Sequence, residues 1–257
     1  MSPGDGDEMA LEALIARLHY YSDLGEAERA ALAGLAVAPR RFSANTQIIS
    51  AGQEMDAVLV MRDGWAARFK ALEDGRRQIL NILLPGDIFD LQVLVAAEAD
   101  HSIVTVTDGS LYAVAPGAVR DILAGSGALS MAFWWTQVQE EAFLREQIVR
   151  NGRQTAQERI GHLLLELHRR ARIVNQASED AMPLPLTQTQ IADTLGLTPI
   201  HTNRVLRRLV RAGLIEMNRQ HIRFLDQDAL AEMCDFDPSY FHLDAFRMRL
   251  GRGVGGR

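Results

Sequence analysis

Hydrophobic positions repeat with a helical period at both ends of the chain, whereas its middle consists of short extended runs. Residues 9–36 place leucines and isoleucines three and four positions apart, with a break at 22–25. From Arg40 onward, short apolar runs alternate with glycine-containing turns. The runs are 46–50, 57–61, 66–72, 78–84, 102–107 and 110–114. Short strands with turns about every 8–12 residues predict an antiparallel barrel or jelly roll, and 92–98 predicts a helical turn lying against it.

Residues 116–149 are predicted to be helical and carry two apolar stripes. The first stripe has spacings of four and three, typical of a helix that pairs with a partner helix, and it comprises Met131, Trp135, Val138, Ala142, Arg145 and Val149. The second, Trp134, Leu144 and Ile148, is expected to face the roll of its own subunit. One subunit can hardly cover both stripes, so the pattern favours a dimer over a helix packed only within its own chain. Asn151–Gly152 is the predicted hinge.

Residues 186–215 predict two short helices joined by a tight turn. Ala192 lets a second helix cross closely, and Gly196 can adopt the positive φ of the turn. Thr198 suits the N-cap of the second helix and Pro199 its first position. The apolar side chains expected to face inward are Ile191, Leu195, Val205, Leu206 and Leu209, and those expected outside are Asn203, Arg204, Arg207, Arg208 and Arg211.

This arrangement is typical of a helix-turn-helix, in which exposed side chains of the second helix contact bases in the major groove. Segments 214–217 and 222–225 flank a polar turn and predict a small β-hairpin wing. The alternative interpretation is a helical hairpin with a solvated arginine-rich face.

The distribution of charge changes what the total charge implies. The 257 residues carry a formal net charge of −6, which argues against nucleic acid. Residues 150–225, however, hold 12 arginines against 6 acidic residues, a net charge of +6. A basic segment on an acidic body concentrates phosphate attraction on one module. No apolar run approaches the ~20 residues of a membrane span, and no signal pattern is present, so we expect a cytoplasmic protein without a membrane partner.

In this order, the β-roll, long helix and winged helix-turn-helix over residues 20–230 resemble the Crp/Fnr family of bacterial transcription regulators. The most specific motifs are Leu186–Thr198, Asn203–Arg204 and Gly213–Leu214–Ile215, and the roll matches through Ile49-x-x-Gly52, Gly64 and Leu84–Pro85–Gly86–Asp87. The resemblance implies a symmetric homodimer on double-stranded DNA, with half-sites ~10 base pairs apart and helix 198–212 in the major groove. It also implies contact with RNA polymerase, although no residue here marks that surface.

The predicted fold class is α+β, with an N-terminal antiparallel β-roll (jelly roll), a long dimerisation helix and a C-terminal winged helix-turn-helix. The expected divisions are an N-terminal tail and helix at 1–24, a sensor-like roll at 25–125, the dimerisation helix at 126–151, the DNA-binding domain at 152–235 and a C-terminal tail at 236–257.

The resemblance assigns DNA contacts by position. Arg204 matches the family's base-reading arginine, whose guanidinium suits the O6/N7 edge of guanine. Asn203 and His201 are its polar neighbours. Ile200 stands where the family commonly presents Glu; it could meet a thymine methyl but cannot accept a hydrogen bond from cytosine, so we expect a departure from the usual half-site. The residues expected to hold phosphates are Gln188, Thr198, Arg207, Arg219 and His221.

The ligand chemistry of the family is degenerate here. Members that bind cyclic AMP carry Gly-Glu-Leu and later Arg-Ser or Arg-Thr, and counting without gaps places these on Asp90, Leu91, Gln92, His101 and Ser102. Leu91 cannot accept a ribose hydroxyl, Asp90 adds a repelling charge, and His101, taken as a lone surface histidine, is no permanent cation. We therefore do not expect cyclic AMP, haem or a metal. The single cysteine, Cys234, excludes an iron–sulfur cluster.

Two other function classes compete with this interpretation. An enzyme is not expected, because no phosphate loop, metal spacing or catalytic constellation is present, and Glu140–Glu141 is interpreted as a solvated helix face. A ligand-binding regulatory subunit that acts on protein partners is the alternative, but a docking helix gains little from exposed arginines. The cofactor is unknown: the roll either binds an unidentified small molecule or is a dimer scaffold without ligand control.

Overall fold

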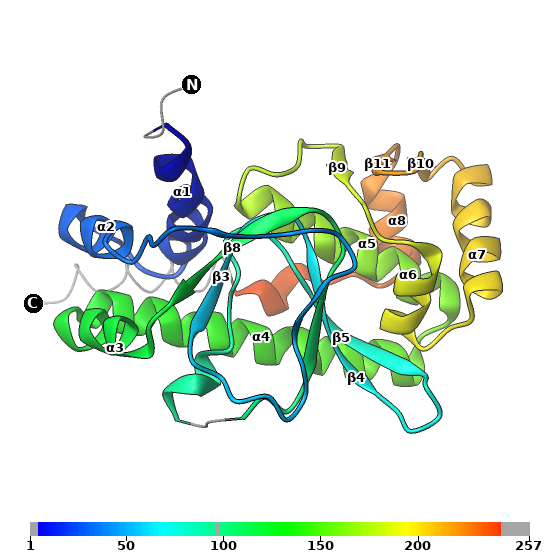
Figure 1. The fold of residues 1–257 in the computed structure, drawn as a ribbon. Helices are drawn as coiled ribbons and strands as arrows, with labels where there is room; N and C mark the ends of the chain where they lie inside the picture. Colours follow the sequence, from blue (N-terminus) through cyan, green and yellow to red (C-terminus); the bar gives the residue numbers. More distant parts are fainter. Residues whose placement is uncertain (1–4, 96–97, 243–257) are drawn as a thin grey trace, which may run out of the picture.

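The computed structural model describes residues 5–95 and 98–242 as a strand-rich body crossed by one long helix, with a helical module at one end (Figure 1). The helices are α1 (Asp5–His19), α2 (Glu26–Ala33), α3 (Pro116–Gly125), α4 (Gly127–Arg153), α5 (Ala156–Ile173), α6 (Gln188–Leu195), α7 (Pro199–Arg211) and α8 (Gln227–Met233), with 3₁₀ helices η1 (Leu91–Leu94) and η2 (Pro238–Phe241). In the described residues, no helix has the length and hydropathy needed to cross a bilayer.

Eight strands form two four-stranded antiparallel sheets, ordered β1-β8-β3-β6 and β2-β7-β4-β5. Their bounds are β1 (Arg40–Phe42), β2 (Gln47–Ile49), β3 (Val58–Asp63), β4 (Ala66–Ala71), β5 (Arg77–Leu83), β6 (Ile88–Phe89), β7 (Ser102–Thr105) and β8 (Gly109–Val114). A third sheet, β10-β11-β9, consists of β9 (Ala181–Pro183), β10 (Ile215–Met217) and β11 (His221–Phe224). The predicted α+β class, β-roll and winged helix-turn-helix are confirmed.

The roll is covered on both faces, which explains why its strands are more apolar than simple alternation requires. Leu59 and Met61 of β3 face the core between the two sheets, whereas Val58 and Val60 pack against the helices that flank the roll. On the other sheet, Ile79 of β5 belongs to the same buried cluster as the helices of the C-terminal module. The C-terminal module therefore shares an apolar core with the roll.

The predicted helical segment 116–149 contains two helices that meet at Ser126, close to the expected start of the dimerisation helix. This residue is extended (φ −142°, ψ 118°), and its hydroxyl accepts a hydrogen bond from the N–H of Leu129 at 3.3 Å, so it begins α4. The predicted hinge at Asn151–Gly152 is wrong, because α4 continues through both residues to Arg153. The chain turns at Gln154, and Thr155 begins α5 with a capping box to Glu158.

The expected C-terminal tail starts with an ordered, buried segment. Tyr240 and Phe241 of η2 pack against Phe143 of α4 and against Ile173 and Val174 at the end of α5. The rings of Phe143 and Phe241 lie edge to face, with centroids 5.1 Å apart. Residues up to 242 are thus part of the fold, and the rest of the predicted tail, 243–257, lies outside the described residues.

Candidate nucleic-acid interface

Local sequence signals build the two helices of the module. Thr187 caps α6: its hydroxyl accepts from the N–H of Gln190 at 3.2 Å, and its own N–H donates to the Gln190 side chain at 2.8 Å. Gly196 ends α6 in the left-handed region (φ 64°), where a side chain would be strained. Thr198 then caps α7 by accepting from the N–H of His201 at 3.2 Å, and Pro199 occupies the first helical position.

Helix α7 divides into a buried and an exposed face. Thr202, Val205, Leu206 and Leu209 are buried against the rest of the module. Of the predicted base-reading residues, Ile200 is 75% exposed, Arg204 is exposed, and His201 and Asn203 are half-buried. An isoleucine this exposed at the start of a helix has no core to pack into, so it is free to contact an apolar group such as a thymine methyl.

The predicted phosphate-binding residues surround this face. Gln188 and Thr198 are exposed at the N-termini of α6 and α7, where the positive ends of the helix dipoles lie. Arg207 is exposed on α7. In the wing, Arg219 is exposed in the turn between β10 and β11, and His221 is exposed at the start of β11. The Asn218 side chain accepts from the N–H groups of Gln220 and His221, each at 2.9 Å.

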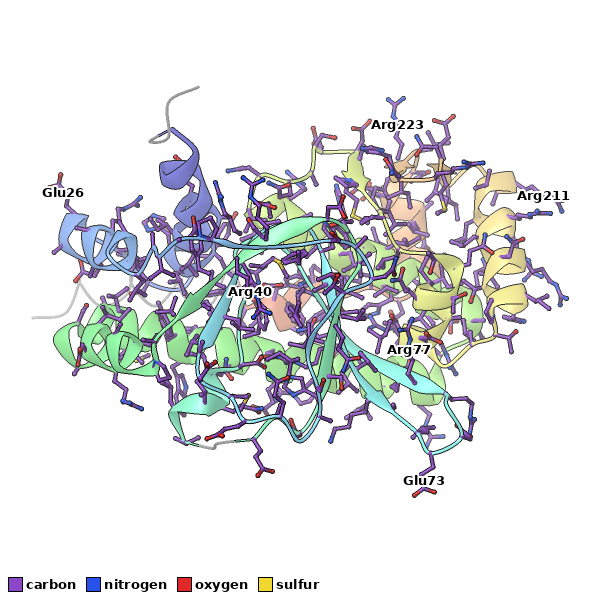
Figure 2. The ribbon with its side chains drawn as sticks, viewed as in Figure 1. Glu26, Arg40, Glu73, Arg77, Arg211 and Arg223 are labelled. Carbon is purple, nitrogen blue, oxygen red and sulfur yellow. The ribbon has the colours of Figure 1, made fainter. Side chains whose placement is uncertain are left out.

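Not every arginine of the basic segment is available to DNA. Arg150 and Arg170 are each 2% exposed and pair with Glu166 (3.1 Å) and Asp87 (3.0 Å). In contrast, Arg204, Arg207, Arg208 and Arg211 are exposed on α7, a helix without acidic residues. Figure 2 shows Arg211 pointing away from the body at the end of the molecule. The basic surface is therefore concentrated on α7 and the wing.

The predicted dimer seam on α4 is partly wrong, because half of it is out of phase by one residue. Ala142 is 2% exposed, and Trp135 is half-buried and stacks on Tyr21 with centroids 6.1 Å apart. Trp134 and Ile148, assigned to the roll of the same subunit, are instead 67% and 72% exposed. The predicted residues Met131 and Val149 are each 53% exposed, and Val138 is half-buried.

The exposed face of α4 retains a heptad spacing. Its residues, three and four positions apart, are Met131, Trp134, Val138, Glu141, Arg145 and Ile148. Leu144, also assigned to the roll, is 38% exposed beside this row, and Glu141 pairs with Arg145 along the helix. We define the row from Met131 to Ile148, without Leu144, as the α4 stripe. Large apolar side chains at such spacing suit a partner helix better than water.

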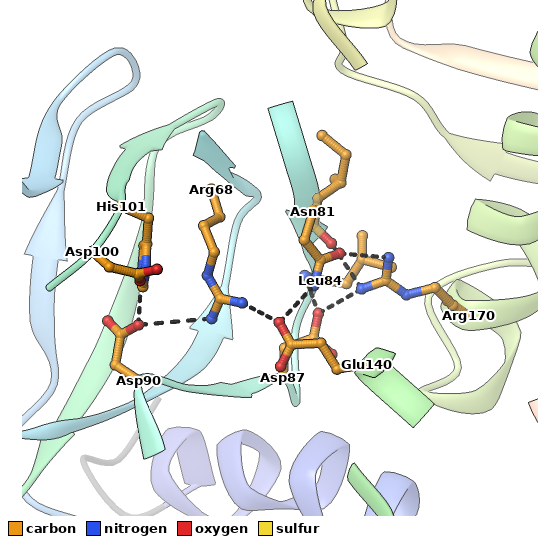
Figure 3. A network of polar contacts seen from close by, with 10 residues as sticks. Arg68, Asn81, Leu84, Asp87, Asp90, Asp100, His101, Glu140 and Arg170 are labelled. Carbon is orange, nitrogen blue, oxygen red and sulfur yellow. Dashed lines mark hydrogen bonds and ion pairs between the residues drawn. The ribbon is translucent and has the colours of Figure 1, made fainter. Parts of the chain in front are cut away.

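The position of the degenerate ligand cassette is filled by a network of charged side chains (Figure 3). Arg68 of β4 pairs with Glu140 of α4 and lies 3.7 Å from Asp90. The same Asp90 oxygen contacts Nε2 of His101 at 2.9 Å, and Nδ1 of His101 contacts Asp100 at 2.8 Å. The hydrogen bond from His101, with the nearby Lys70 ammonium, lowers the pKa of Asp100. One oxygen of the buried Asp90 carboxylate is thus shared between Arg68 and His101 inside the roll.

This network continues to the C-terminal module. The Asn81 amide donates to Glu140 at 3.4 Å and accepts from Arg170 of α5 at 3.2 Å. Arg170 also donates to the Ile82 carbonyl at 2.7 Å and pairs with Asp87. Arg17 of α1 pairs with the other Asp87 oxygen at 2.7 Å. Asp87 therefore joins α1, the roll and α5.

Two predictions about this region are wrong. His101 is not a surface residue, since it is 4% exposed and contacts carboxylates through both ring nitrogens. Glu140 is not part of a solvated face, because it pairs with Arg68; its neighbour Glu141 is exposed as predicted. Of the other cassette positions, Leu91 and Gln92 are half-buried in η1, and the Ser102 hydroxyl accepts from the Ala51 N–H at 3.0 Å.

Sequence reasoning missed Arg68 and Asn81, and it gave Asp87 no role beyond the family motif. A usable signal existed for the first two, because Arg68 and Asn81 are directly opposite one another in the predicted hairpin of β4 and β5. A cavity of about 200 Å³ remains beside this network, bordered by Leu80, Gln137 and Leu144 among others.

In residues 5–95 and 98–242, no group of three His, Cys, Asp or Glu side chains is arranged to hold a metal ion. Burial raises the pKa of the Cys234 thiol to about 12, which disfavours the thiolate that metals and oxidants require.

Comparisons with known proteins agree with this geometry. Residues 158–233 match the Crp-like helix-turn-helix domain, and residues 39–126 match the cyclic nucleotide-binding domain. The nitrogen fixation regulation protein FixK of Azorhizobium caulinodans is 30% identical over 196 residues, which cover 76% of this chain and 78% of that protein. The transcriptional activator protein FnrL of Cereibacter sphaeroides is 29% identical over 197 residues, covering 75% and 79%.

Solved structures show the same fold. FixK2 from Bradyrhizobium japonicum superposes with a TM-score of 0.68 at 25% identity, covering 76% of this chain and 97% of that chain. A CRP-family transcriptional regulator from Thermus thermophilus superposes with a TM-score of 0.58 at 20% identity, covering 77% and 97%.

Proposed function

Because the chain belongs to the Crp/Fnr family of transcription regulators, we propose that two copies pair through α4 and recognise a palindromic DNA site with their α7 helices. The observation that carries this proposal is the exposed, acid-free face of α7, with Arg204 in its N-terminal half and the wing beside it. The protein is a DNA-binding transcription regulator. The proposal concerns its DNA contacts, its pairing surface and its lack of cyclic AMP binding.

In the proposed complex, α7 enters the major groove with its N-terminal turns against the base edges. Arg204 donates to the O6/N7 edge of guanine, Asn203 and His201 contact neighbouring bases, and Ile200 contacts a thymine methyl. The residues proposed to hold phosphates, and so to fix the register, are Gln188, Thr198, Arg207, Arg219 and His221. Contact with RNA polymerase and a cytoplasmic location belong to the same proposal through the family.

The proposed pairing surface is the α4 stripe. Paired across a twofold axis, Trp134 and Ile148 are removed from water, and the Glu141 and Arg145 side chains can exchange partners between subunits. When the two α4 helices pair in parallel, both α7 helices lie at the same end of the pair, because in each subunit α7 lies beyond the C-terminal end of α4 (Figure 1).

The salt dependence of binding tests DNA recognition against docking to a protein. Arg207 and Arg219 place four guanidinium–phosphate contacts in a dimer, so log K should fall with log salt with a slope of roughly −4 or steeper. Arg207→Ala should make the slope shallower by roughly 2, because one contact is lost in each subunit. The measurement is fluorescence anisotropy of labelled duplex across a salt series.

Arg172→Ala is the matched control, because Arg172 is exposed at the C-terminal end of α5, outside α7 and the wing. This substitution should leave the slope of log K against log salt unchanged. A slope near zero for the unmodified protein would instead support the regulatory subunit that acts on protein partners.

We also propose that the roll does not bind cyclic AMP in the family's manner. The guanidinium nearest the pocket, Arg68, is engaged by Glu140 and Asp90, and a phosphodiester would meet the carboxylates of Asp90 and Asp100. Cyclic AMP should therefore leave the melting temperature unchanged, because a ligand raises it only by binding the folded state. Differential scanning fluorimetry with the full chain measures this, and a dose-dependent rise would contradict the proposal.

A further inference from the structure

We propose that Arg77, Gln78, Gln147 and Asn151 are positioning residues that fix the orientation of α7 relative to α4. We refer to them as the α6-binding residues. They touch no DNA; they act through α6, to which α7 is joined. The inference rests on the proposed function, since it concerns how the two recognition helices of a dimer are set for their half-sites.

The central contact is the carbonyl oxygen of Thr194, one of the last in α6. Gln78 of β5 donates to it at 2.9 Å, Asn151 of α4 at 3.1 Å, and Gln147 of α4 at 3.5 Å. Gln147 also donates to the Ile79 carbonyl of β5 at 2.9 Å. The last carbonyls of a helix have no partner within the helix, so they bind other backbone groups, water or side chains from elsewhere. Here both the roll and the dimer helix supply those side chains.

A charged pair strengthens the same junction. Nε of Arg77 donates to Asp193 of α6 at 2.7 Å, and the Arg77 guanidinium also lies over the Phe69 ring, 5.6 Å from its centroid. Figure 2 shows Arg77 on the strand that faces this module. Beneath these polar contacts, Ile79 is fully buried in the core shared with α5 and α6.

These contacts position α7 because α6 and α7 share a buried core and are joined by a short connection. Leu195 of α6 and Leu209 of α7 are both fully buried in one core. Only residues 196–198 separate the end of α6 from the start of α7. Figure 1 shows α6 between β5 and α7. Fixing Thr194 to both β5 and α4 therefore fixes the direction in which the base-contacting face points from the dimer helix.

With α6 held in this way, the proposed DNA-contacting residues remain exposed. The α6-binding residues contact the C-terminal end of α6, and they leave Gln188 at its N-terminus exposed, together with Ile200 and Arg204 on α7. Interdomain contacts of this kind raise the effective concentration of the second α7 at its half-site when the first is bound. They should thus set which half-site spacing is tolerated.

The test uses the full chain with Gln78→Ala and Asn151→Ala combined, and Arg77→Ala separately. DNA is a palindrome selected from random duplexes by the unmodified protein, versions with one or two base pairs added or removed at its centre, and a duplex with one half-site. Gln176→Ala, an exposed glutamine after α5, is the matched control. Melting temperature and dimer mass establish that each variant folds and pairs.

We expect the double variant to bind the palindrome at least about tenfold more weakly, to bind the single half-site unchanged, and to discriminate less between spacings. Arg77→Ala should show the same pattern more weakly, because its ion pair is partly exposed. A spacing profile identical to that of the unmodified protein would overturn the inference. Tighter binding by the variants would also overturn it, because the contacts of the α6-binding residues would then hold α7 away from DNA. If the unmodified protein selects no palindrome at all, the proposed function itself fails.

Discussion

Replacing Arg204 with alanine is expected to weaken binding of the palindrome. Each half-site should lose ~1–3 kcal/mol of binding free energy, which is about 5- to 150-fold per half-site. The guanidinium is exposed in the N-terminal half of α7. Within the described part of the chain it is engaged by no carboxylate, so it gives up no partner to bind a base. Competition binding against duplexes changed at single positions should show relaxed choice at one base pair per half-site and unchanged choice elsewhere.

Arg211→Ala provides the control for that experiment. Arg211 is exposed on the same helix but at its C-terminal end, where side chains contact the backbone rather than bases. Its loss should weaken all duplexes by a similar, smaller factor. The assignment of Arg204 is contradicted if Arg204→Ala keeps both the affinity and the base preference of the unmodified protein.

The second large effect is expected at the α4 stripe. Trp134→Glu combined with Ile148→Glu should yield a monomer, because pairing would bury four unpartnered carboxylates at the helix seam. Losing the partner removes the second recognition helix, so affinity for the palindrome should fall by about 10²–10⁴. Sedimentation velocity gives the mass, and binding to palindrome and half-site duplexes gives the affinity.

Both substitutions replace exposed side chains, so the fold of the single chain should survive. Val37→Glu, at a residue 47% exposed between α2 and β1, is the matched control and should remain dimeric with full affinity. A double variant that still sediments as a dimer would show that the subunits pair through another surface.

The helix-turn-helix could be predicted closely because its signals are local. Gly196, Thr198 and Pro199 each act on backbone within three or four residues, and the structure shows them ending or starting the helices as expected. The apolar pattern then places Val205 and its neighbours inside without reference to the rest of the chain.

The phase of the α4 stripe could not be settled in this way. The sequence offers adjacent apolar pairs, Trp134–Trp135 and Ile148–Val149, and either member of each pair gives a plausible seam. The choice at the first pair is made by tertiary packing: Tyr21 of the N-terminal region stacks on Trp135, and Trp134 is left in solvent. Such contacts join residues more than a hundred positions apart.

The charged network in the roll was missed for the same reason. Arg68, Glu140 and Arg170 come from a strand and two helices, and each alone resembles an ordinary surface charge. Only the fold brings them together, where each carboxylate balances a guanidinium that would otherwise be buried alone. The missing Gly-Glu-Leu and Arg-Ser chemistry was visible in the sequence, and so were Asp90 and His101 in its place, but their contacts with Arg68 and with each other were not.

The most direct test of the central claim is the composition and affinity of the complex on the selected palindrome. Sedimentation equilibrium should give two chains per duplex, and removing one half-site should lower affinity by about 10²–10⁴ while leaving the base preference of the remaining half unchanged. One chain per duplex, with equal affinity for the palindrome and the half-site, would contradict recognition by a twofold pair of α7 helices.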